Sequence, residues 1–298
     1  MVFDDIIGHE VQKSYLRRVL EHDQRAHAYA FLGPRGAGKM AIAKRLVATL
    51  LEINVDGLAS HPDVTILGRE DDDKGNKRQT ISIEAVKEAC ERLGLSAVHA
   101  LKVVIVDDAD TMTVQAQNAL LKTLEEPQGQ SLVILLAEDR SRLLPTILSR
   151  VVSVAFVHVP TDTIKQGLLD QGYTSRVAEE AARLAGGRPG IAMQYADADQ
   201  LMAARRERTE LERFIDAPLY QQIKTLSEIT KGDDALSAEA RFAWLDRLTD
   251  ALHERLIVPS GNQPQIVAAL QAALGARQAM RENVSPALAL ERIATNLH

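Results

Sequence analysis

Hydrophobic and polar positions follow different patterns in the two halves of this 298-residue chain. Before residue 160, short apolar runs alternate with segments in which apolar residues recur every three to four positions. Such runs are typical of buried strands, and such spacing is typical of amphipathic helices. From Thr161 the strand pattern is absent and helical periodicity continues to the end. We therefore predict an α/β domain followed by all-α segments.

The first half has the alternation of strands and helices that specifies a parallel sheet. Right-handed crossovers between parallel strands place helices on both faces of such a sheet. The expected strands are residues 28–32, 61–67, 102–106 and 132–136, and the expected helices are residues 11–20, 41–51, 83–93, 117–127 and 144–148. Ser82 is placed to cap the third helix. Residues 68–79 are expected to form an exposed charged loop.

The helical half is predicted to contain a small domain followed by a larger bundle. Glycine- and proline-containing segments interrupt it at residues 186–190, 232–234 and 259–264. Two apolar stripes, expected to be core or a surface for partners, are Phe242, Leu245, Leu248, Leu252 and Leu256, and Ile266, Val267, Leu270 and Leu274. The predicted domains are residues 1–158 (α/β), 159–204 (small helical) and 205–298 (helical bundle).

The strongest candidate for chemistry is the segment GPRGAGK at residues 33–39, between the first strand and its helix. Gly33, Gly36 and Gly38 lack a Cβ, so the backbone can curl and direct successive N–H groups at one centre, beside the positive end of a helix dipole. Lys39 adds a cation for the outer phosphates. A glycine loop between a strand and a helix is typical of phosphate-binding loops. The segment is therefore a candidate nucleotide site.

Met40 departs from this pattern. A phosphate-binding loop ordinarily continues with a Ser or Thr whose hydroxyl binds Mg²⁺. Met40 offers only a thioether, which is a poor ligand for a hard cation. The sequence thus predicts a nucleotide fold with impaired metal chemistry. In the alternative interpretation, residues 33–38 serve only as a tight turn between strand and helix.

Two carboxylates, Asp107 and Asp108, end the β-branched strand predicted at residues 102–106. Because the carboxyl ends of strands face the ligand in open α/β sheets, Asp107 is expected near Lys39 and the metal position. Asp108 stands where hydrolytic proteins with this loop usually carry a water-polarising glutamate. Aspartate is one methylene shorter, and a displacement of about 1 Å in a catalytic group can cost on the order of a hundredfold. Alternatively, the two aspartates only end the strand.

Composition narrows the class of protein. With 46% apolar and 26% charged residues, the chain resembles an ordinary soluble protein. No apolar run approaches the roughly 20 residues of a membrane span, and the amino terminus lacks the form of a signal peptide, so a cytoplasmic protein is expected. One cysteine, Cys90, excludes an internal disulfide and any multi-cysteine zinc site. The net charge of −6 argues against nucleic-acid binding driven by overall charge, although a local basic face stays possible.

Several segments together resemble the bacterial clamp-loader subunits of DNA polymerase III, members of the AAA+ superfamily. The glycine loop and the acids already described are joined by NALLKTLEEP at residues 118–127 and LPTILSR at residues 144–150. Further matching segments are residues 3–10, 27–31, 61–64 and 103–110, and in the helical half GRPGIAM at residues 187–193. The resemblance implies a P-loop AAA+-like domain, a small helical lid and a carboxy-terminal collar through which subunits assemble.

Departures from the motor subunits of this family point to its delta-prime type. The motor subunits carry a four-cysteine zinc module where residues 52–60 contain no cysteine, so no zinc is expected. Their Lys-Ser or Lys-Thr, Asp-Glu and Arg-Asp-Ala-Leu motifs are replaced by Lys39-Met40, Asp107-Asp108 and the segment 190–193. The turn at residues 137–139, where the family has a polar sensor, is shortened. The resemblance therefore implies that ATP or ADP binds weakly or not at all, with Mg²⁺ only alongside nucleotide.

Arg150 is retained. In this family the matching arginine reaches across a subunit interface and stabilises charge on the ATP of the neighbour, as an arginine finger. The resemblance implies this role for Arg150; the alternative is that it only caps the carboxyl end of a helix. The implied partners are gamma/tau and delta subunits in a hetero-pentamer, with the sliding clamp and primer-template DNA reached through the complex.

Two other functions are alternatives to this one. The chain could be an active ATPase of the same superfamily, such as a gamma/tau-like motor subunit. A small-molecule kinase built on the same loop is disfavoured, because no acceptor-site motif is visible and half the chain is helical.

Overall fold

The computed structural model describes residues 2–22, 25–69, 80–95, 97–98, 101–127, 129–231, 236–257, 262–282 and 284–298. Contacts divide the chain into two compact units, Met1–Ala196 and Asp197–His298. Most of the predicted charged loop, residues 70–79, lies outside the described residues. The same is true of the predicted helix break at residues 232–234 and of residues 259–261 in the break predicted at 259–264.

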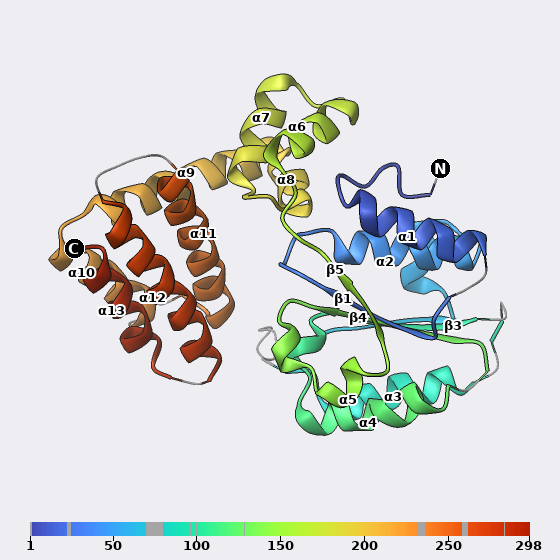
Figure 1. Cartoon of the computed structure of the whole chain (residues 1–298). Helices are drawn as coiled ribbons and strands as arrows, with labels where there is room; N and C mark the ends of the chain where they lie inside the picture. The colour runs from blue at the N-terminus through green and yellow to red at the C-terminus, as the bar shows by residue number, and fades with distance from the viewer. Residues whose placement is uncertain are drawn as a thin grey trace. The chain divides into compact units, whose positions relative to one another are not determined.

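Five parallel strands form the sheet of the first unit, in the order β2-β3-β4-β1-β5 (Figure 1). They are β1 (Ala28–Leu32), β2 (Val64–Leu67), β3 (Lys102–Val106), β4 (Ser131–Ala137) and β5 (Val152–Ala155). Strands β1, β3 and β4 are buried along their whole length. Because all five strands point the same way, the loops that follow them meet at one edge of the sheet.

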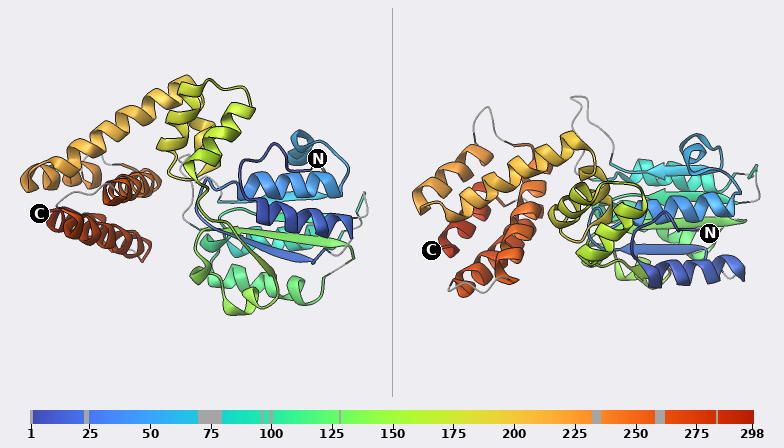
Figure 2. Two further views of the ribbon diagram at one scale, coloured as in Figure 1. Left: turned by 45° about the horizontal axis from the view of Figure 1, so that its top comes forward. Right: turned by 90° about the horizontal axis from the view of Figure 1, so that it is seen from above.

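Helices cover both faces of the sheet, as the views in Figures 1 and 2 agree. One face carries α1 (Glu10–Glu21) and α2 (Lys39–Leu50); the other carries α3 (Ile83–Leu93), α4 (Val114–Glu125) and α5 (Pro145–Leu148). Neighbouring strand positions face opposite sides. Ile105 therefore packs in one core with Ile42 of α2, and Val104 in a second core with Leu120 of α4.

The predicted strands and helices of this unit are confirmed, with small shifts at their ends. The first strand and the helix at 83–93 have the predicted bounds, and the Ser82 hydroxyl accepts a hydrogen bond from the Ala85 N–H at 3.3 Å. Helix α4 begins three residues before the predicted Gln117, because Thr113 caps it by accepting the Ala116 N–H at 3.1 Å. Capping residues thus decided where these helices begin.

Three shorter helices complete the first unit: α6 (Thr161–Asp170), α7 (Ser175–Leu184) and α8 (Pro189–Tyr195). Their core is rich in alanine and also contains Ile7 from the segment ahead of α1. A Cβ on Gly167 of α6 would lie 2.6 Å from the Ile7 side chain, so only glycine leaves room for this contact. The amino-terminal segment therefore ties these helices to the α/β part of the unit.

The second unit is all-helical. It consists of α9 (Ala198–Asp216), α10 (Leu219–Thr230), α11 (Ala238–Ile257), α12 (Gln263–Arg281) and α13 (Pro286–Asn296). The domain boundary predicted at residues 204/205 lies inside α9, which is continuous and capped by Asp197. The units instead separate between Ala196 and Asp197. No helix in the described ranges is long and apolar enough to cross a membrane.

The two predicted apolar stripes of the second unit fared differently. Leu245, Leu248 and Leu252 of α11 are fully buried, and Phe242 and Leu256 are partly buried, so most of the first stripe belongs to the core. In the second stripe Ile266 is buried and Leu270 partly buried, whereas Val267 and Leu274 of α12 are exposed, so only part of this stripe belongs to the core. The buried face of α12 is instead Ile266, Ala269, Ala273 and Ala276. Alanine, which the stripe omitted, leaves room for close helix packing, so α12 turns its small side chains to the core.

Candidate nucleotide loop and arginine pocket

The glycine loop follows β1 at the carboxyl edge of the sheet and leads directly into α2. Gly36 and Gly38 have φ angles of 78° and 102°, which L-residues with side chains rarely adopt. Gly33 is required for another reason: a Cβ there would lie 2.2 Å from the carbonyl oxygen of Phe156. The predicted tight turn between strand and helix is therefore present, and each of the three predicted glycines contributes to its path.

Lys39 is turned back onto its own loop. Its ammonium group donates hydrogen bonds to the carbonyl oxygens of Gly33 and of Pro34, the second at 2.9 Å. Burial lowers the pKa of Lys39, and the surrounding carboxylates, Glu138 foremost and Asp107 among them, act in the opposite direction. The structure thus brings the predicted lysine and strand-end acid together.

The amino end of α8 lies directly on the glycine loop. The Gly190 N–H donates a hydrogen bond to the Gly36 carbonyl oxygen at 2.8 Å. A Cβ on Gly190 would lie 2.9 Å from that oxygen, and a Cβ on Gly36 would lie 2.5 Å from the Ile191 side chain. Residues 190–193 stand where the motor subunits are expected to carry an arginine. At the loop they provide backbone and an aliphatic side chain.

His9 contacts the loop from the amino-terminal segment. It is 7% exposed, and its Nε2–H donates a hydrogen bond to the Ala37 carbonyl oxygen at 2.6 Å. The ring meets Phe156 edge-on, with 4.9 Å between ring centroids. Burial lowers the pKa of His9, although the bond to Ala37 opposes this effect. A neutral imidazole therefore holds the loop here.

Met40 contributes to packing. It lies in the first turn of α2, partly buried against the core that includes Phe31 and Ile42. Its thioether replaces the hydroxyl that would bind a hard cation. This position therefore offers Mg²⁺ no oxygen ligand.

The two predicted acids after β3 have different surroundings. Burial raises the pKa of Asp107, Asp108 raises it further, and Lys39 acts against both. An Asp107 carboxylate oxygen also accepts the Asp108 N–H at 3.1 Å. Asp108 is paired with Arg69, whose Nε and Nη2 both lie 3.0 Å from Oδ2. The acid in the water-polarising position is thus bound to an arginine of the same chain.

A buried carboxylate organises the turn after β4. Asp110 is 4% exposed, and its two oxygens accept the N–H groups of Glu138 and Asp139 at 3.2 and 3.3 Å. Glu138 in turn accepts the backbone N–H of Arg35, in the glycine loop, at 3.3 Å. One of the N–H groups that such a loop would direct at a phosphate therefore has a carboxylate of the chain as its partner.

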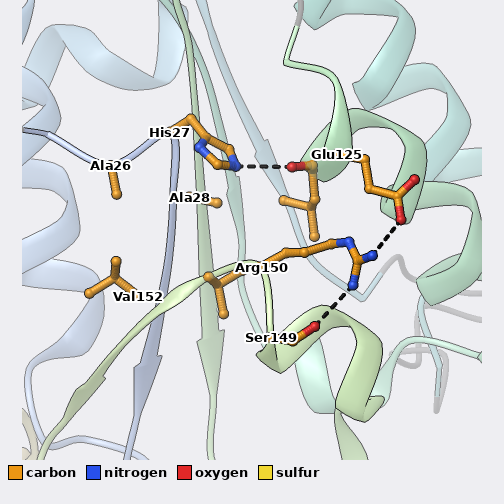
Figure 3. A pocket seen from close by; sticks show the side chains of 9 residues that line it. Ala26, His27, Ala28, Glu125, Ser149, Arg150 and Val152 are labelled. Carbon is orange, nitrogen blue, oxygen red and sulfur yellow. Dashed lines mark hydrogen bonds and ion pairs between the residues drawn. The ribbon is translucent and has the colours of Figure 1, made fainter.

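Arg150 lies in an open pocket, drawn in Figure 3. Its Nη1 donates hydrogen bonds to the Thr146 carbonyl oxygen at 3.0 Å and to the Ser149 hydroxyl at 2.9 Å. Its Nη2 lies 2.8 Å from a carboxylate oxygen of Glu125, and the side chain is 36% exposed. The bond to the Thr146 carbonyl oxygen is the contact expected in the alternative interpretation, in which Arg150 caps the carboxyl end of α5. The Arg150 side chain is thus partly exposed.

The pocket lies at the amino edge of the sheet, where β1 and β5 begin. It is lined by Ala26, His27, Ala28, Leu124, Glu125, Ser149, Arg150, Val151 and Val152. His27 joins the start of β1 to the end of α4, because its Nε2–H donates to the Leu124 carbonyl oxygen at 3.0 Å. Strand β1 rises about 13 Å from Ala28 to Leu32, at about 3.3 Å per residue. Arg150 and the glycine loop are thus separated by the length of β1.

Sequence reasoning identified the glycines, the lysine, the acids and the arginine, but missed the residues that bind them. Arg69, Glu138 and Glu125 each form an ion pair or hydrogen bond with a segment distant in the chain. Their own segments gave no periodicity or spacing that signals such a contact. Only the fold, which sets which loops meet, could identify them.

The sheet order, the glycine loop after β1, the acids after β3 and the helices α6 to α8 define a P-loop protein of the AAA+ type. A solved structure of similar fold is a DNA polymerase III gamma subunit-related protein from Thermotoga maritima, with a TM-score of 0.56 over 95% of this chain and 98% of that one. The two sequences are 22% identical, so this likeness shows the fold alone.

Sequence comparison narrows the class to a family. Residues 8–160 match the family described as DNA polymerase III, delta subunit. Subunit delta' of Pseudomonas aeruginosa is 30% identical over 240 residues, 74% of this chain and 70% of that protein. Subunit delta' of Bacillus subtilis is 31% identical over 178 residues, 55% of this chain and 52% of that protein. The chain therefore belongs to this DNA polymerase III family. Within the family it is of the delta-prime type of clamp-loader subunit.

Proposed function

We propose that this chain acts as a delta-prime-like subunit of a bacterial replicative clamp loader and assists the ATP-dependent loading of a sliding clamp onto DNA. It assembles in the cytoplasm with gamma/tau and delta subunits in a hetero-pentamer, and reaches the clamp and primer-template DNA through that complex. Its own nucleotide site is degenerate, and Arg150 acts as an arginine finger on the ATP of a neighbour. Family membership supports the general role. The structure at the two edges of the sheet supports the separate roles proposed for the nucleotide site and for Arg150.

The two helical parts have separate proposed roles. Helices α6 to α8 serve as the lid, and the second unit serves as the collar through which subunits associate. In support of the collar, exposed apolar side chains occur on its helices, among them Tyr220 of α10, Leu274 of α12 and Leu288 of α13, which are 69%, 58% and 63% exposed. Where such side chains form a contiguous patch, they mark a site of protein association.

The observation that carries the proposal is that polar groups of the glycine loop already have hydrogen-bond partners within the same chain. Lys39 donates to the carbonyl oxygens of Gly33 and Pro34, and the Arg35 N–H donates to Glu138. A nucleoside triphosphate would have to displace these contacts and bring its own negative charge close to Glu138. Because two negative charges at close range repel each other, a carboxylate beside the loop disfavours nucleotide binding.

The same loop does not fit Mg²⁺-dependent hydrolysis. Met40 supplies no oxygen ligand, and the charge of Asp108 is neutralised by Arg69. Hydrolysis requires a coordinated metal and an acid or polar group that orients water. No reaction step is therefore assigned to this site.

Arg150 supports the second half of the proposal by its location. It lies at the amino edge of the sheet and is separated from its own glycine loop by the length of β1. Its guanidinium therefore cannot contact a phosphate bound at that loop. A guanidinium presents up to five N–H donors in a planar group that matches phosphoryl oxygens. Placed beside the ATP of a neighbour, it would stabilise the negative charge that develops as the terminal phosphoryl group is transferred to water.

Reconstitution with the other loader subunits of the same cell tests this function. With Arg150→Ala, single-turnover hydrolysis at the adjoining site is expected to fall about 10³-fold or more, the usual range for a lost arginine finger. With Lys39→Ala, the matched change at the other edge, turnover of the complex is expected to stay unchanged. The isolated chain is expected to hydrolyse no ATP with Mg²⁺.

The same assay separates the rival function. If the isolated chain turns over ATP and Lys39→Ala abolishes that turnover, the chain is an active, gamma/tau-like ATPase. If Arg150→Ala leaves the complex unchanged, the trans-acting role of Arg150 is rejected.

A further inference from the structure

Glu125 is the only acidic side chain among the residues that line the arginine pocket. It is the last residue of α4, and a carboxylate oxygen lies 2.8 Å from Nη2 of Arg150. Figure 3 shows Glu125 and Ser149 on two sides of the guanidinium. The Glu125 side chain is 49% exposed, so this ion pair lies at the mouth of the pocket.

The three contacts of Arg150 leave part of its donor capacity available. Its Nη1 bonds to Thr146 and Ser149 use two N–H groups, and the Nη2 pair with Glu125 uses a third. A guanidinium has five N–H donors. In the part of the chain that the structure describes, no hydrogen bond or ion pair engages the remaining two, so Glu125 and an incoming phosphoryl oxygen can bind the same guanidinium.

Glu125 differs from the other two partners in where it comes from. Thr146 and Ser149 lie four and one residues from Arg150, so they move with it at the end of α5. Glu125 belongs to α4, whose last turn is joined to β1 by the bond from His27 to the Leu124 carbonyl oxygen. Only the contact with Glu125 therefore fixes the guanidinium relative to another helix of the domain.

We propose that Glu125 is a positioning residue for the Arg150 finger, an inference that rests on the function proposed above. Arginine has a long side chain with large rotational freedom, and a half-exposed one would spread over many rotamers. Glu125 restricts it to the orientation seen in the pocket. Less ordering is then required when the finger meets the transition state, and this raises the rate of the chemical step.

The exposure of the pair argues against an inhibitory role. Ion pairs between exposed side chains are weak and are readily rearranged. Glu125 therefore does not compete strongly with a phosphoryl group that carries more charge. Removal of Glu125 is expected to lower the rate of the complex and not to raise it.

The test uses the reconstituted complex and two pairs of variants. Glu125→Ala is expected to lower kcat for ATP about tenfold with KM little changed, since the finger acts in the transition state. Glu125→Gln keeps an oxygen acceptor of the same length and is expected to recover most of the loss. Glu126→Ala and Glu126→Gln are matched controls at the adjacent exposed glutamate, and are expected to leave kcat unchanged.

A double variant separates positioning from a structural effect. In the Arg150→Ala background, Glu125→Ala is expected to cause no further loss, because its effect passes through the arginine. An additional loss there, an unchanged kcat with Glu125→Ala alone, or an increase in kcat would each overturn the proposal. If Arg150→Ala itself has no effect, the proposed function has failed. If Arg150→Ala is severe and Glu125→Ala is silent, only the role of Glu125 has failed.

Discussion

Two edges of one parallel sheet hold a cation in opposite ways. At the carboxyl edge, Lys39 is bent onto the carbonyl oxygens of its own loop. At the amino edge, Arg150 is held in an open pocket with its side chain partly exposed. The first cation is used within the chain, and the second stays accessible to a partner. If the function proposed above holds, this fold keeps a catalytic contribution at one edge while the other edge supports no hydrolysis.

The glycines of this loop have a structural role that is independent of nucleotide. Gly33 leaves space for Phe156, and Gly36 leaves space for Ile191 of α8. Both glycines are therefore required by packing within the first unit, whether or not a phosphate ever binds. A glycine loop read from sequence is consequently weaker support for a nucleotide than the residues that should bind the metal and the water.

The largest effect on stability is expected where α8 meets the loop. Gly36→Ala combines a backbone with φ 78° and a Cβ at 2.5 Å from Ile191, so we expect it to destabilise the full chain by about 2–5 kcal/mol. Gly57→Ala is the matched control, because a Cβ there meets no atom within 4 Å. Urea denaturation followed by circular dichroism measures both. A Gly36→Ala variant as stable as the control would show that α8 is not held tightly on the loop.

A smaller effect, on nucleotide affinity, is expected when the carboxylate of Glu138 is removed from the loop. Met40→Thr combined with Glu138→Gln restores a hydroxyl for Mg²⁺ and removes one negative charge beside the Arg35 N–H. Since one charge at close range contributes on the order of 1 kcal/mol or more, we expect binding of a fluorescent ATP analogue to tighten about tenfold. Isothermal or fluorescence titration with Mg²⁺ gives the affinity.

Lys39→Ala in the same background serves as the control and should abolish the gain. If the double variant binds no better than the wild type, the contact of α8 with Gly36 excludes nucleotide more effectively than the charge of Glu138 does.

The fold was largely predictable, because it depends on local patterns. Apolar runs located the buried strands, and Ser82 located the start of α3. The stripe on α12, predicted as core or partner surface, included the exposed Val267 and Leu274 and omitted the alanines that occupy the core. Alanine is compatible with surface and core alike, so composition alone does not tell which face of α12 is buried.

The candidate site was predictable in its main residues and not in their partners. Gly36, Lys39 and Asp107 lie in the segments that directly follow predicted strands. Because the carboxyl ends of parallel strands meet at one edge of the sheet, these residues are expected to lie close together. The pairing of Asp108 with Arg69 depends on how the segment after β2 folds over the end of β3. Such contacts follow from the tertiary structure, and residue spacing carries no information about them.

The smallest effect concerns pH. Burial lowers the pKa of His9 below its unfolded value of 6.5, so the native state binds fewer protons than the unfolded state as pH falls. The stability that His9 contributes is fully present above pH 6.5 and is lost as the pH falls through the folded pKa. The melting temperature should therefore fall between pH 7.5 and pH 5, as thermal denaturation would show.

His9→Asn should reduce this pH dependence, because asparagine tolerates the φ of 59° at this position and does not titrate. His253→Asn, at an exposed histidine of α11, is the control and should leave the pH profile as it is. An unchanged profile in His9→Asn would mean that the imidazole is protonated in place without releasing the Ala37 carbonyl. In that case His9 would add a positive charge to the loop at low pH, and the loop would become more attractive to phosphate under acid conditions.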